Sequence, residues 1–211
     1  MIDTIIRIAV LLFAVTIHEY SHGKAALSLG DPTAKNSGRL TLNPIRHIDP
    51  IGAVCMYLFG IGWAKPVPVN TAYFANRRKD TILMAISGPV SNLAAAFVAG
   101  LLIRYYDMPV DIYRLILVNM LLLNIGLGLF NLLPIPPLDG SHVLENILPS
   151  GLASGYQKIR RYAPIVFLGI LIADHYLKFN IFGRILSYPI IATAELFAGP
   201  KIFHLLRIYR F

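Results

Sequence analysis

Charged residues are scarce in this chain, and cysteine is almost absent. Asp, Glu, Lys and Arg make up 14% of the 211 residues, while hydrophobic residues make up 56%. Soluble domains carry about 25% charged residues, so this composition argues against a disordered chain and against an ordinary soluble domain. Because Cys55 is the single cysteine, an internal disulfide is excluded. The 16 Gly and 14 Pro residues follow no period, which excludes a collagen-like or low-complexity sequence.

Long runs without charge predict helices that cross a membrane. Residues 81–103 and 115–138 contain no Asp, Glu, Lys or Arg, and a helix needs about 20 such residues to cross the hydrocarbon core. Residues 2–29 are also apolar and long enough to span, although they carry charges. The runs 162–173 and 185–194 approach the required length when their flanking residues are included. We therefore expect about five transmembrane helices.

The segment between the first and second spans has a different pattern. Residues 50–64 carry no charge but include three glycines, and 15 residues are too few for a span. We expect a re-entrant or buried segment here. The alternation of Val and Pro that follows, up to Asn70, is typical of extended chain and of an edge strand. The predicted fold is thus an all-α polytopic membrane protein with a small re-entrant or β-strand region.

The positive charge of the chain fits membrane topology better than nucleic-acid binding. The net charge is +8, and the basic residues cluster between the apolar runs rather than along one face. With five spans, most of the 19 Lys and Arg residues fall on one side. Because basic loops stay in the cytoplasm, we expect the N-terminus outside and the C-terminus in the cytoplasm.

The first span contains a motif with a known chemical use. His18-Glu19-Tyr20-Ser21-His22 has the form H-E-x-x-H, and residues four apart lie on the same face of a helix. Two imidazoles on one face can bind a zinc ion, and the Glu between them can act as a general base. In an apolar span these polar residues have no solvated face, so the alternative is a polar cluster between helices that conducts protons or ions.

A third ligand is expected from a catalytic zinc site, and Asp139 is the best candidate. It follows the uncharged run 115–138, whose last part contains Pro134, Pro136 and Pro137. Prolines exclude a regular helix, so the backbone must unwind at membrane depth, where only a cavity or protein contacts tolerate it. The alternative role for Asp139 is to cap the next helix. His142 is a rival ligand for which we favour a supporting role.

Together these motifs resemble the site-2 protease family of intramembrane zinc metalloproteases. The resemblance rests on residues 18–22, on Asn131 through Gly140, and on Ser87-Gly88-Pro89-Val90-Ser91-Asn92. Residues 38–52 and 62–70 resemble a compact prokaryotic subgroup that lacks a PDZ domain. The match is close over about residues 8–150 and rests on hydropathy alone afterwards.

The resemblance implies a role for each of these residues. His18, His22 and Asp139 would bind one Zn²⁺ per chain, and Glu19 would act as the general base and pass a proton to the leaving amine. Asn92 would hold the substrate or the oxyanion, with a hydrogen bond between helices as its alternative role. Four residues would support the turn before the third ligand, namely Asn131, Pro134, Pro136 and Gly140.

The resemblance also implies an activity and a location. Residues 1–211 would form a single membrane-embedded metalloprotease domain, with its catalytic core at 1–150 and additional helices at 151–211. It would cleave a membrane-anchored protein within the bilayer of a prokaryotic cell membrane, without nucleic acid. The competing hypotheses are an ion pathway or transporter that uses the intramembrane His, Glu and Asp, and an inactive relative kept as a scaffold. Two His and one carboxylate also suit Fe(II).

Overall fold

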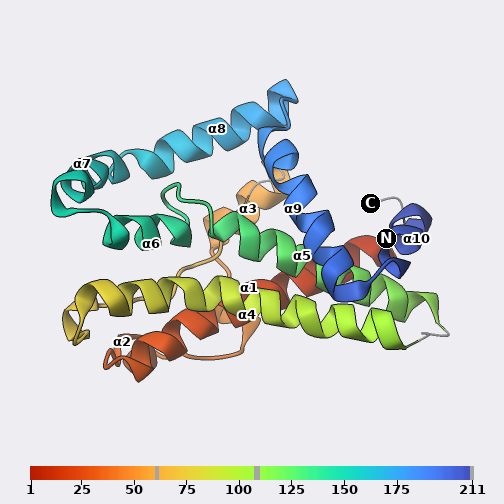
Figure 1. The fold of residues 1–211 in the computed structure, drawn as a ribbon, viewed down its shortest axis with the longest axis horizontal. Helices are drawn as coiled ribbons and strands as arrows, with labels where there is room; N and C mark the ends of the chain where they lie inside the picture. The colour runs from red at the N-terminus through yellow and green to blue at the C-terminus, as the bar shows by residue number, and fades with distance from the viewer. Residues whose placement is uncertain (60–61, 107–109, 210–211) are drawn as a thin grey trace.

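The computed structural model describes residues 1–59, 62–106 and 110–209, which are mostly helical (Figure 1). These residues form no β-sheet, and their one isolated β-bridge pairs Ile48 with Ala64. The helices, including two short 3₁₀ helices (η), are α1 Ile2–Ser28, α2 Thr33–Asn36, η1 Pro44–His47, α3 Pro50–Phe59, η2 Thr71–Tyr73, α4 Arg77–Tyr105, α5 Asp111–Asn131, α6 Asp139–Ile147, α7 Ser150–Arg160, α8 Ala163–Leu177, α9 Ile181–Ala198 and α10 Lys201–Tyr209.

Helix α4 lies at the centre of the molecule and packs against α1, α5, α6 and α9. Small residues on α4 allow this close packing, since Gly88, Ala96, Ala99 and Gly100 leave room for the neighbouring helices. A Cβ at Gly100 would lie 2.6 Å from that of Phe197 on α9. The main apolar core lies between α4, α5, α9 and α10.

Within the described residues, three helices are long and apolar enough to cross a membrane: α4, α5 and α9. Helix α4 contains the predicted span 81–103, and α5 contains most of the predicted span 115–138. Helix α5 ends at Asn131, so the chain unwinds before the prolines as predicted. Helix α8 is a shorter apolar helix. The prediction of about five spans is therefore not confirmed.

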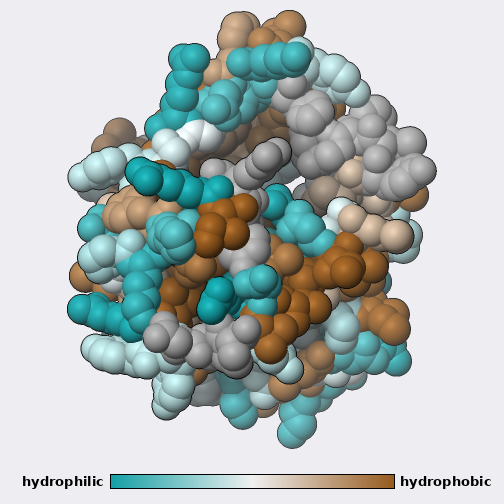
Figure 2. Space-filling model, turned by 90° about the vertical axis from the view of Figure 1, so that its right-hand side faces the viewer, coloured by the Kyte–Doolittle hydropathy of each residue, from teal (hydrophilic) through white to brown (hydrophobic). Residues whose placement is uncertain are grey.

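Many large apolar side chains face outward, which soluble proteins largely avoid. Ile5 on α1, Phe97 on α4, Ile165 on α8 and Leu196 on α9 are all exposed. Figure 2 shows apolar surface between polar side chains at the end of the molecule where α10 lies. Such a surface fits helices surrounded by lipid.

Helix α10 lies at the same end of the bundle as the beginning of α1 (Figure 1). Helix α1 is antiparallel to α4, because Ala14 contacts Asn92 while His22 contacts Met84. Ile202 of α10 packs in one buried cluster with Ile103 near the end of α4. The predicted topology instead places the two ends of the chain on opposite sides of the membrane.

The predicted re-entrant or β-strand region is a helix followed by extended chain. Helix α3 takes up Pro50–Phe59, and residues 60–61 of the predicted segment lie outside the described residues. The strand expected before Asn70 is not formed in the part of the chain that the structure describes. The physical reason is that Pro66 and Pro68 have no N–H group, while the Val67 N–H bonds the Glu19 side chain instead of another strand.

Asp31 joins the end of α1 to this extended segment. Its side chain is fully buried. One carboxylate oxygen accepts hydrogen bonds from the Thr33 N–H at 2.9 Å and from the Thr33 hydroxyl, and the other accepts from the Asn70 N–H at 2.7 Å. Burial alone raises the pKa of the Asp31 carboxyl, but these hydrogen bonds outweigh it and the pKa is lowered.

We expect Asp31→Asn to destabilise the protein by about 1–3 kcal/mol at pH 7, because an amide cannot accept on both sides. A group whose pKa is lowered by folding stabilises above its unfolded pKa, about 3.9 for Asp, and this stabilisation is lost as the pH falls through the folded pKa. The difference from wild type should therefore shrink below about pH 4. Thermal unfolding in detergent measures both effects. Asp111→Asn, at an exposed side chain, is the control, and equal stability of Asp31→Asn and wild type at pH 7 would contradict the prediction.

Candidate metal centre

His18 and His22 lie one turn apart on α1, and both side chains are buried against α4. Their rings meet edge to face at an interplanar angle of 84°. The apolar residues that precede His18 make this part of the chain helical, and the spacing of four puts both rings on the same face. The motif is therefore on a helix, as the sequence predicts.

Asp139 completes a cluster with the two histidines. Its Oδ2 atom lies 3.0 Å from Nε2 of His18 and 3.2 Å from Nε2 of His22, and the two Nε2 atoms are 3.0 Å apart. Ligands about 2.0–2.1 Å from a tetrahedral zinc ion would be about 3.3 Å apart. The three ligand atoms thus already have nearly the spacing that zinc requires, across more than a hundred residues of sequence.

The hydrogen bonds behind the rings determine which nitrogen faces the cluster. Nδ1 of His18 lies 2.6 Å from Oδ1 of Asn92, and Nδ1 of His22 lies 2.9 Å from the Met84 carbonyl. Both partners can only accept, so each Nδ1 carries a hydrogen, and in a neutral ring Nε2 then presents a lone pair. Two such lone pairs and a carboxylate repel one another unless a positive charge lies between them. The donor set fits a divalent cation.

The turn that carries Asp139 is tightly packed. A Cβ at Gly140 would lie 2.2 Å from the Leu132 carbonyl oxygen, so only glycine allows α6 to start this close to the end of α5. The residue that caps α6 is Leu138, which makes no side-chain cap. The Asp139 carboxylate faces the histidines instead. The geometry favours the ligand role over helix capping.

The four residues predicted to support the turn before Asp139 make different contacts. Gly140 is needed for close packing, and the Pro134 carbonyl accepts a hydrogen bond from the Tyr156 hydroxyl at 3.1 Å. Pro136 lines an apolar pocket. Asn131 donates from Nδ2 to the Leu127 carbonyl within its own helix, at 3.0 Å. Its side chain therefore bonds α5 and not the turn.

Glu19 is outside the three-residue cluster. Its Oε2 accepts a hydrogen bond of 2.8 Å from the Val67 N–H in the extended segment after α3. This bond brings extended chain directly beside the Glu between the two histidines. Glu19 is half-buried, and its other carboxylate oxygen has no hydrogen-bond partner among the described residues.

Asn92 is fully buried, and both hydrogens of its amide group are used inside the protein. Oδ1 faces His18, while Nδ2 donates to the Ala14 carbonyl and to Oδ1 of Asn124, both at 2.9 Å. No amide hydrogen is left for a substrate. The geometry favours the hydrogen bond between helices over the predicted oxyanion role.

Two residues at the site were missed by the sequence reasoning. Gly88 lies directly against the candidate ligand nitrogens: a Cβ there would be 2.4 Å from Nε2 of His22 and 2.7 Å from Nε2 of His18. Asn124 supports Asn92 from α5. The signals were an unexplained glycine in the Gly-Pro motif and a buried amide in an uncharged run.

His142 is held away from the cluster by Arg160. Nη2 of Arg160 lies 2.8 Å from Nε2 of His142, and Nη1 lies 2.6 Å from Oε2 of Glu145. Burial and the Arg160 charge lower the pKa of the His142 imidazole. This contact gives His142 a supporting position between α6 and α7, as favoured from the sequence.

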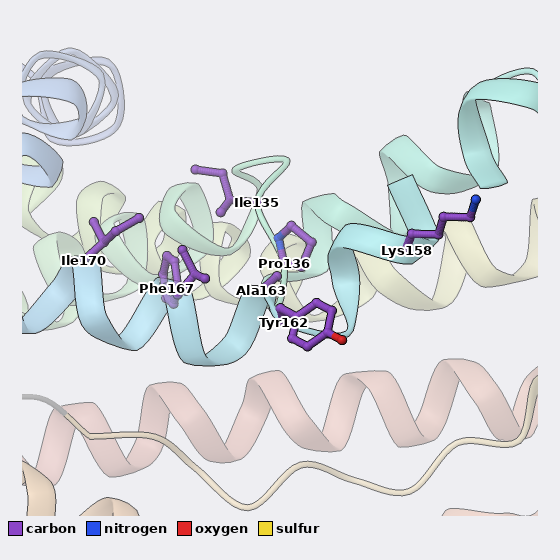
Figure 3. A pocket seen from close by; sticks show the side chains of 8 residues that line it. Ile135, Pro136, Lys158, Tyr162, Ala163, Phe167 and Ile170 are labelled. Atoms are coloured by element: carbon purple, nitrogen blue, oxygen red, sulfur yellow. The ribbon is translucent and has the colours of Figure 1, made fainter. Parts of the chain in front are cut away.

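An apolar pocket lies between the turn and α8. Its volume is about 440 Å³, and the side chains of Ile135 and Pro136 face Ala163 and Phe167, with Lys158 at one edge (Figure 3). The same turn carries Asp139. The pocket is therefore lined in part by the turn that leads to Asp139.

Comparison with known proteins identifies the family. A protein-family model described as "Peptidase family M50" matches residues 108–173. "Putative zinc metalloprotease YwhC" of Bacillus subtilis (strain 168) is 40% identical over 173 residues, which cover 77% of this chain and 78% of that protein. The chain belongs to peptidase family M50, the site-2 protease family. It is a zinc metalloendopeptidase.

More distant relatives of this M50 peptidase have similar names. "Putative zinc metalloprotease Rip2" of Mycobacterium tuberculosis (strain ATCC 25618 / H37Rv) is 32% identical over 171 residues, 78% of this chain and 65% of the relative. "Zinc metalloprotease MJ0392" of Methanocaldococcus jannaschii is 29% identical over 155 residues, 73% of this chain and 37% of the relative. No solved structure matches the chain.

Proposed function

We propose that this M50 peptidase cleaves a peptide bond in or near the transmembrane segment of a membrane-anchored protein. His18, His22 and Asp139 are the zinc ligands, and Glu19 is the general base. One observation carries the proposal: the side-chain atoms that His18, His22 and Asp139 offer to a metal converge within 3.2 Å of one another, among helices whose outer faces are apolar. Ionisable side chains are costly inside a membrane, so a cluster of them there indicates a functional site.

We also propose that α1 crosses the membrane beside α4 and α5. Its 27 residues make a helix about 40 Å long at 1.5 Å per residue, which exceeds a hydrocarbon core of about 30 Å. His18 and His22 lie beyond its middle, so the metal site is nearer to the face where α1 ends. The substrate bond is therefore cut within the bilayer, closer to that face.

The face nearest the metal site is assigned to the cytoplasm of a prokaryotic cell. Basic residues are concentrated on the segments at that end of the bundle, where α2 and α7 lie (Figure 1). They include Lys24, Lys35, Arg77, Arg78, Lys79, Lys158, Arg160 and Arg161. By the positive-inside rule this end is cytoplasmic. The beginning of α1 is then outside, and α10 is on that same side instead of in the cytoplasm.

The extended chain beside Glu19 provides a place for the substrate. A peptide bond in a helix is shielded by its neighbours, so the substrate must unwind before cleavage. The segment from Lys65 to Asn70 is extended, and its Val67 N–H bonds Glu19. An unwound substrate lying along this segment would be next to the base. The apolar pocket at Ile135 and Phe167 suits the apolar side chains of a transmembrane segment.

Each residue of the proposed site has a separate role in the reaction. Zn²⁺, when bound, lowers the pKa of a coordinated water to about 7 and polarises a carbonyl. Asn92 and the Met84 carbonyl orient the His18 and His22 rings. Glu19 accepts a proton on its carboxylate and returns it to the leaving amine. The Val67 N–H holds one Glu19 oxygen, which leaves the other for this transfer.

The test is zinc content measured together with cleavage of a membrane-spanning model substrate. Purified wild-type protein in detergent, prepared without chelator, should hold one zinc per chain by mass spectrometry and cleave the substrate. His18→Ala/His22→Ala should lose both the metal and the activity. His204→Ala, at an exposed histidine on α10, should lose neither. No metal in the wild type, or zinc retained in the double variant, would refute this assignment.

A further inference from the structure

The extended segment of residues 65–70 reaches Glu19 through one backbone N–H group. Pro66 and Pro68 have no N–H, so Val67 carries the single amide hydrogen of residues 66–68. Val67 donates that hydrogen to Oε2 of Glu19 over 2.8 Å. Whatever directs the Val67 N–H therefore also holds the side chain that we assign as the general base.

The Arg39 side chain bonds this segment just before Val67. Its Nη2 donates to the Lys65 carbonyl oxygen at 2.7 Å. Its Nε is buried and has no partner, so the bond to Lys65 is the one hydrogen bond of the guanidinium among the described residues. A charged donor bonds a carbonyl more strongly than a neutral donor does. Arg39 thus holds the Lys65 carbonyl group in one direction.

The end of α2 determines where Arg39 lies. Gly38 has a positive φ of 65°, and the Arg39 N–H bonds the Ala34 carbonyl at 2.9 Å. A left-handed glycine and a bond of this span form a Schellman motif at the end of a helix. Ala34 is fully buried against α1, since its Cβ would lie 3.3 Å from a Cβ on Gly23. Arg39 is therefore anchored to the helix that carries Glu19.

One free torsion separates the Lys65 carbonyl from the Val67 N–H. Each group lies in a planar peptide unit. The two units meet at the Cα atom of Pro66, where φ and ψ are the torsions between them. The proline ring fixes φ at about −65°, so ψ alone remains. A guanidinium that holds the Lys65 carbonyl therefore limits the Val67 N–H to rotation about a single bond.

The other contacts of the segment restrain the Val67 N–H less directly. The Lys65 N–H bonds the His47 carbonyl at 2.9 Å, but it belongs to the preceding peptide unit, and φ and ψ of Lys65 add two torsions. The Asn70 N–H bonds a carboxylate three residues beyond Val67. The buried Val67 side chain packs on α1. These contacts keep the segment beside α1, and Arg39 supplies the restraint nearest to the Val67 N–H.

We propose that Arg39 is a positioning residue for the general base, Glu19. It acts through the Lys65 carbonyl and the rigid Pro66 ring. Together these direct the Val67 N–H at the Glu19 carboxylate. The proposal rests on the assignment of Glu19 as the base. Without the guanidinium the segment stays beside α1, but the Val67 N–H can turn and Glu19 is held less firmly. The two histidines are oriented by α4, so zinc should remain bound.

The experiment compares Arg39→Met, Arg39→Lys, Arg46→Met and wild type in detergent. Arg39→Met removes every donor and keeps an unbranched side chain, whereas Arg39→Lys keeps a charged donor. Arg46 is an exposed arginine between α2 and α3 and provides the control. Initial rates on a membrane-spanning model substrate give kcat and KM, and zinc is measured on the same preparations. NMR of protein labelled with ¹⁵N-valine follows hydrogen exchange of the Val67 amide, whose signal is assigned by its absence in Val67→Ala.

Arg39→Met should keep one zinc per chain and lower kcat about tenfold, the low end of what a hydrogen bond to a charged group contributes. KM should change less, because proton transfer by Glu19 belongs to the chemical step. The Val67 amide should exchange about tenfold faster, by the same loss. Arg39→Lys should recover most of both effects, and Arg46→Met should match wild type. Loss of zinc in Arg39→Met, or wild-type kcat and Val67 exchange, would overturn the proposal.

Two further measurements decide the question if Arg39→Met does not fold. The Val67 amide of the wild type should exchange far more slowly than an amide exposed to solvent, and fast exchange there would overturn the proposal. Pro66→Ala keeps the Arg39 bond but frees φ between the two peptide units. It should retain zinc, speed Val67 exchange and lower kcat. Exchange at the wild-type rate in Pro66→Ala would also overturn the proposal, since Arg39 could not then act through this ring.

The outcomes separate this proposal from the proposed function. If Glu19→Gln cleaves at the wild-type rate, the base has been assigned wrongly and the role of Arg39 falls with it. If Glu19→Gln loses activity while Arg39→Met keeps the kcat and Val67 exchange of the wild type, the protease assignment stands and the role of Arg39 alone is overturned.

Discussion

Glu19→Gln should reduce cleavage by a factor of about 10²–10⁴, the usual contribution of a general base, and should leave one zinc per chain. The amide oxygen of the new side chain can still accept the hydrogen bond from Val67, so the extended segment stays in place. The amide cannot accept a proton at neutral pH. Loss of activity without loss of metal is therefore the expected result.

The measurement pairs initial rates on a membrane-spanning model substrate with zinc content of the same preparation. Val67→Ala is the control, since it keeps the N–H that Glu19 accepts from and removes only side-chain atoms. It should keep zinc and most of the activity. If Glu19→Gln loses its zinc, then Glu19 is a ligand and the metal cluster has been assigned wrongly. If it cleaves at the wild-type rate, another group is the base.

The local parts of the site could be predicted from the sequence because they depend on short-range geometry. The spacing of His18 and His22 determines a shared helix face wherever the helix lies. The prolines after Asn131 end α5 whatever packs around them. Family resemblance then linked Asp139 to the histidines, and the structure places it within 3.2 Å of both Nε2 atoms.

The predictions that the structure does not confirm depend on how distant segments of the chain meet. Hydropathy identifies apolar helices but not the direction in which each one runs. It therefore could not show that α10 lies at the end of the bundle where α1 begins. Among the described residues no strand forms beside Pro68, because the Val67 N–H binds the side chain of Glu19, which lies 48 residues earlier. Alternation of Val and Pro predicts extended chain, and only a partner makes it a strand.

Asn92 and Asn124 show the same limit inside the site. A sequence identifies an amide in an apolar run but not which atoms surround it. Asn92 could bind substrate or another helix, and the partners that decide between the two come from α1 and α5. Asn124 gave no signal beyond its polarity. Asn124 reaches Asn92 only because of the register in which α4 and α5 pack, and no local sequence pattern predicts that register.

Gly88→Ala should abolish stoichiometric zinc binding and, with it, cleavage. The added Cβ would lie 2.4 Å from Nε2 of His22 and 2.7 Å from Nε2 of His18, distances that force atoms to move. The rings cannot swing aside cheaply, since Asn92 and the Met84 carbonyl hold their far nitrogens. The substitution therefore acts directly on the atoms assigned to the metal.

A conventional view of helix stability predicts the opposite for this substitution. Alanine is favoured over glycine in a helix by about 1 kcal/mol, so Gly88→Ala should improve α4 if only the helix mattered. Gly126→Ala on α5 provides the comparison, because a Cβ there meets only Ile190 at 3.7 Å, an ordinary contact. Gly126→Ala should keep one zinc per chain. Equal zinc content in the two variants would mean that α4 does not lie against the ligand nitrogens, and the arrangement of α1 and α4 around the metal would have to be abandoned.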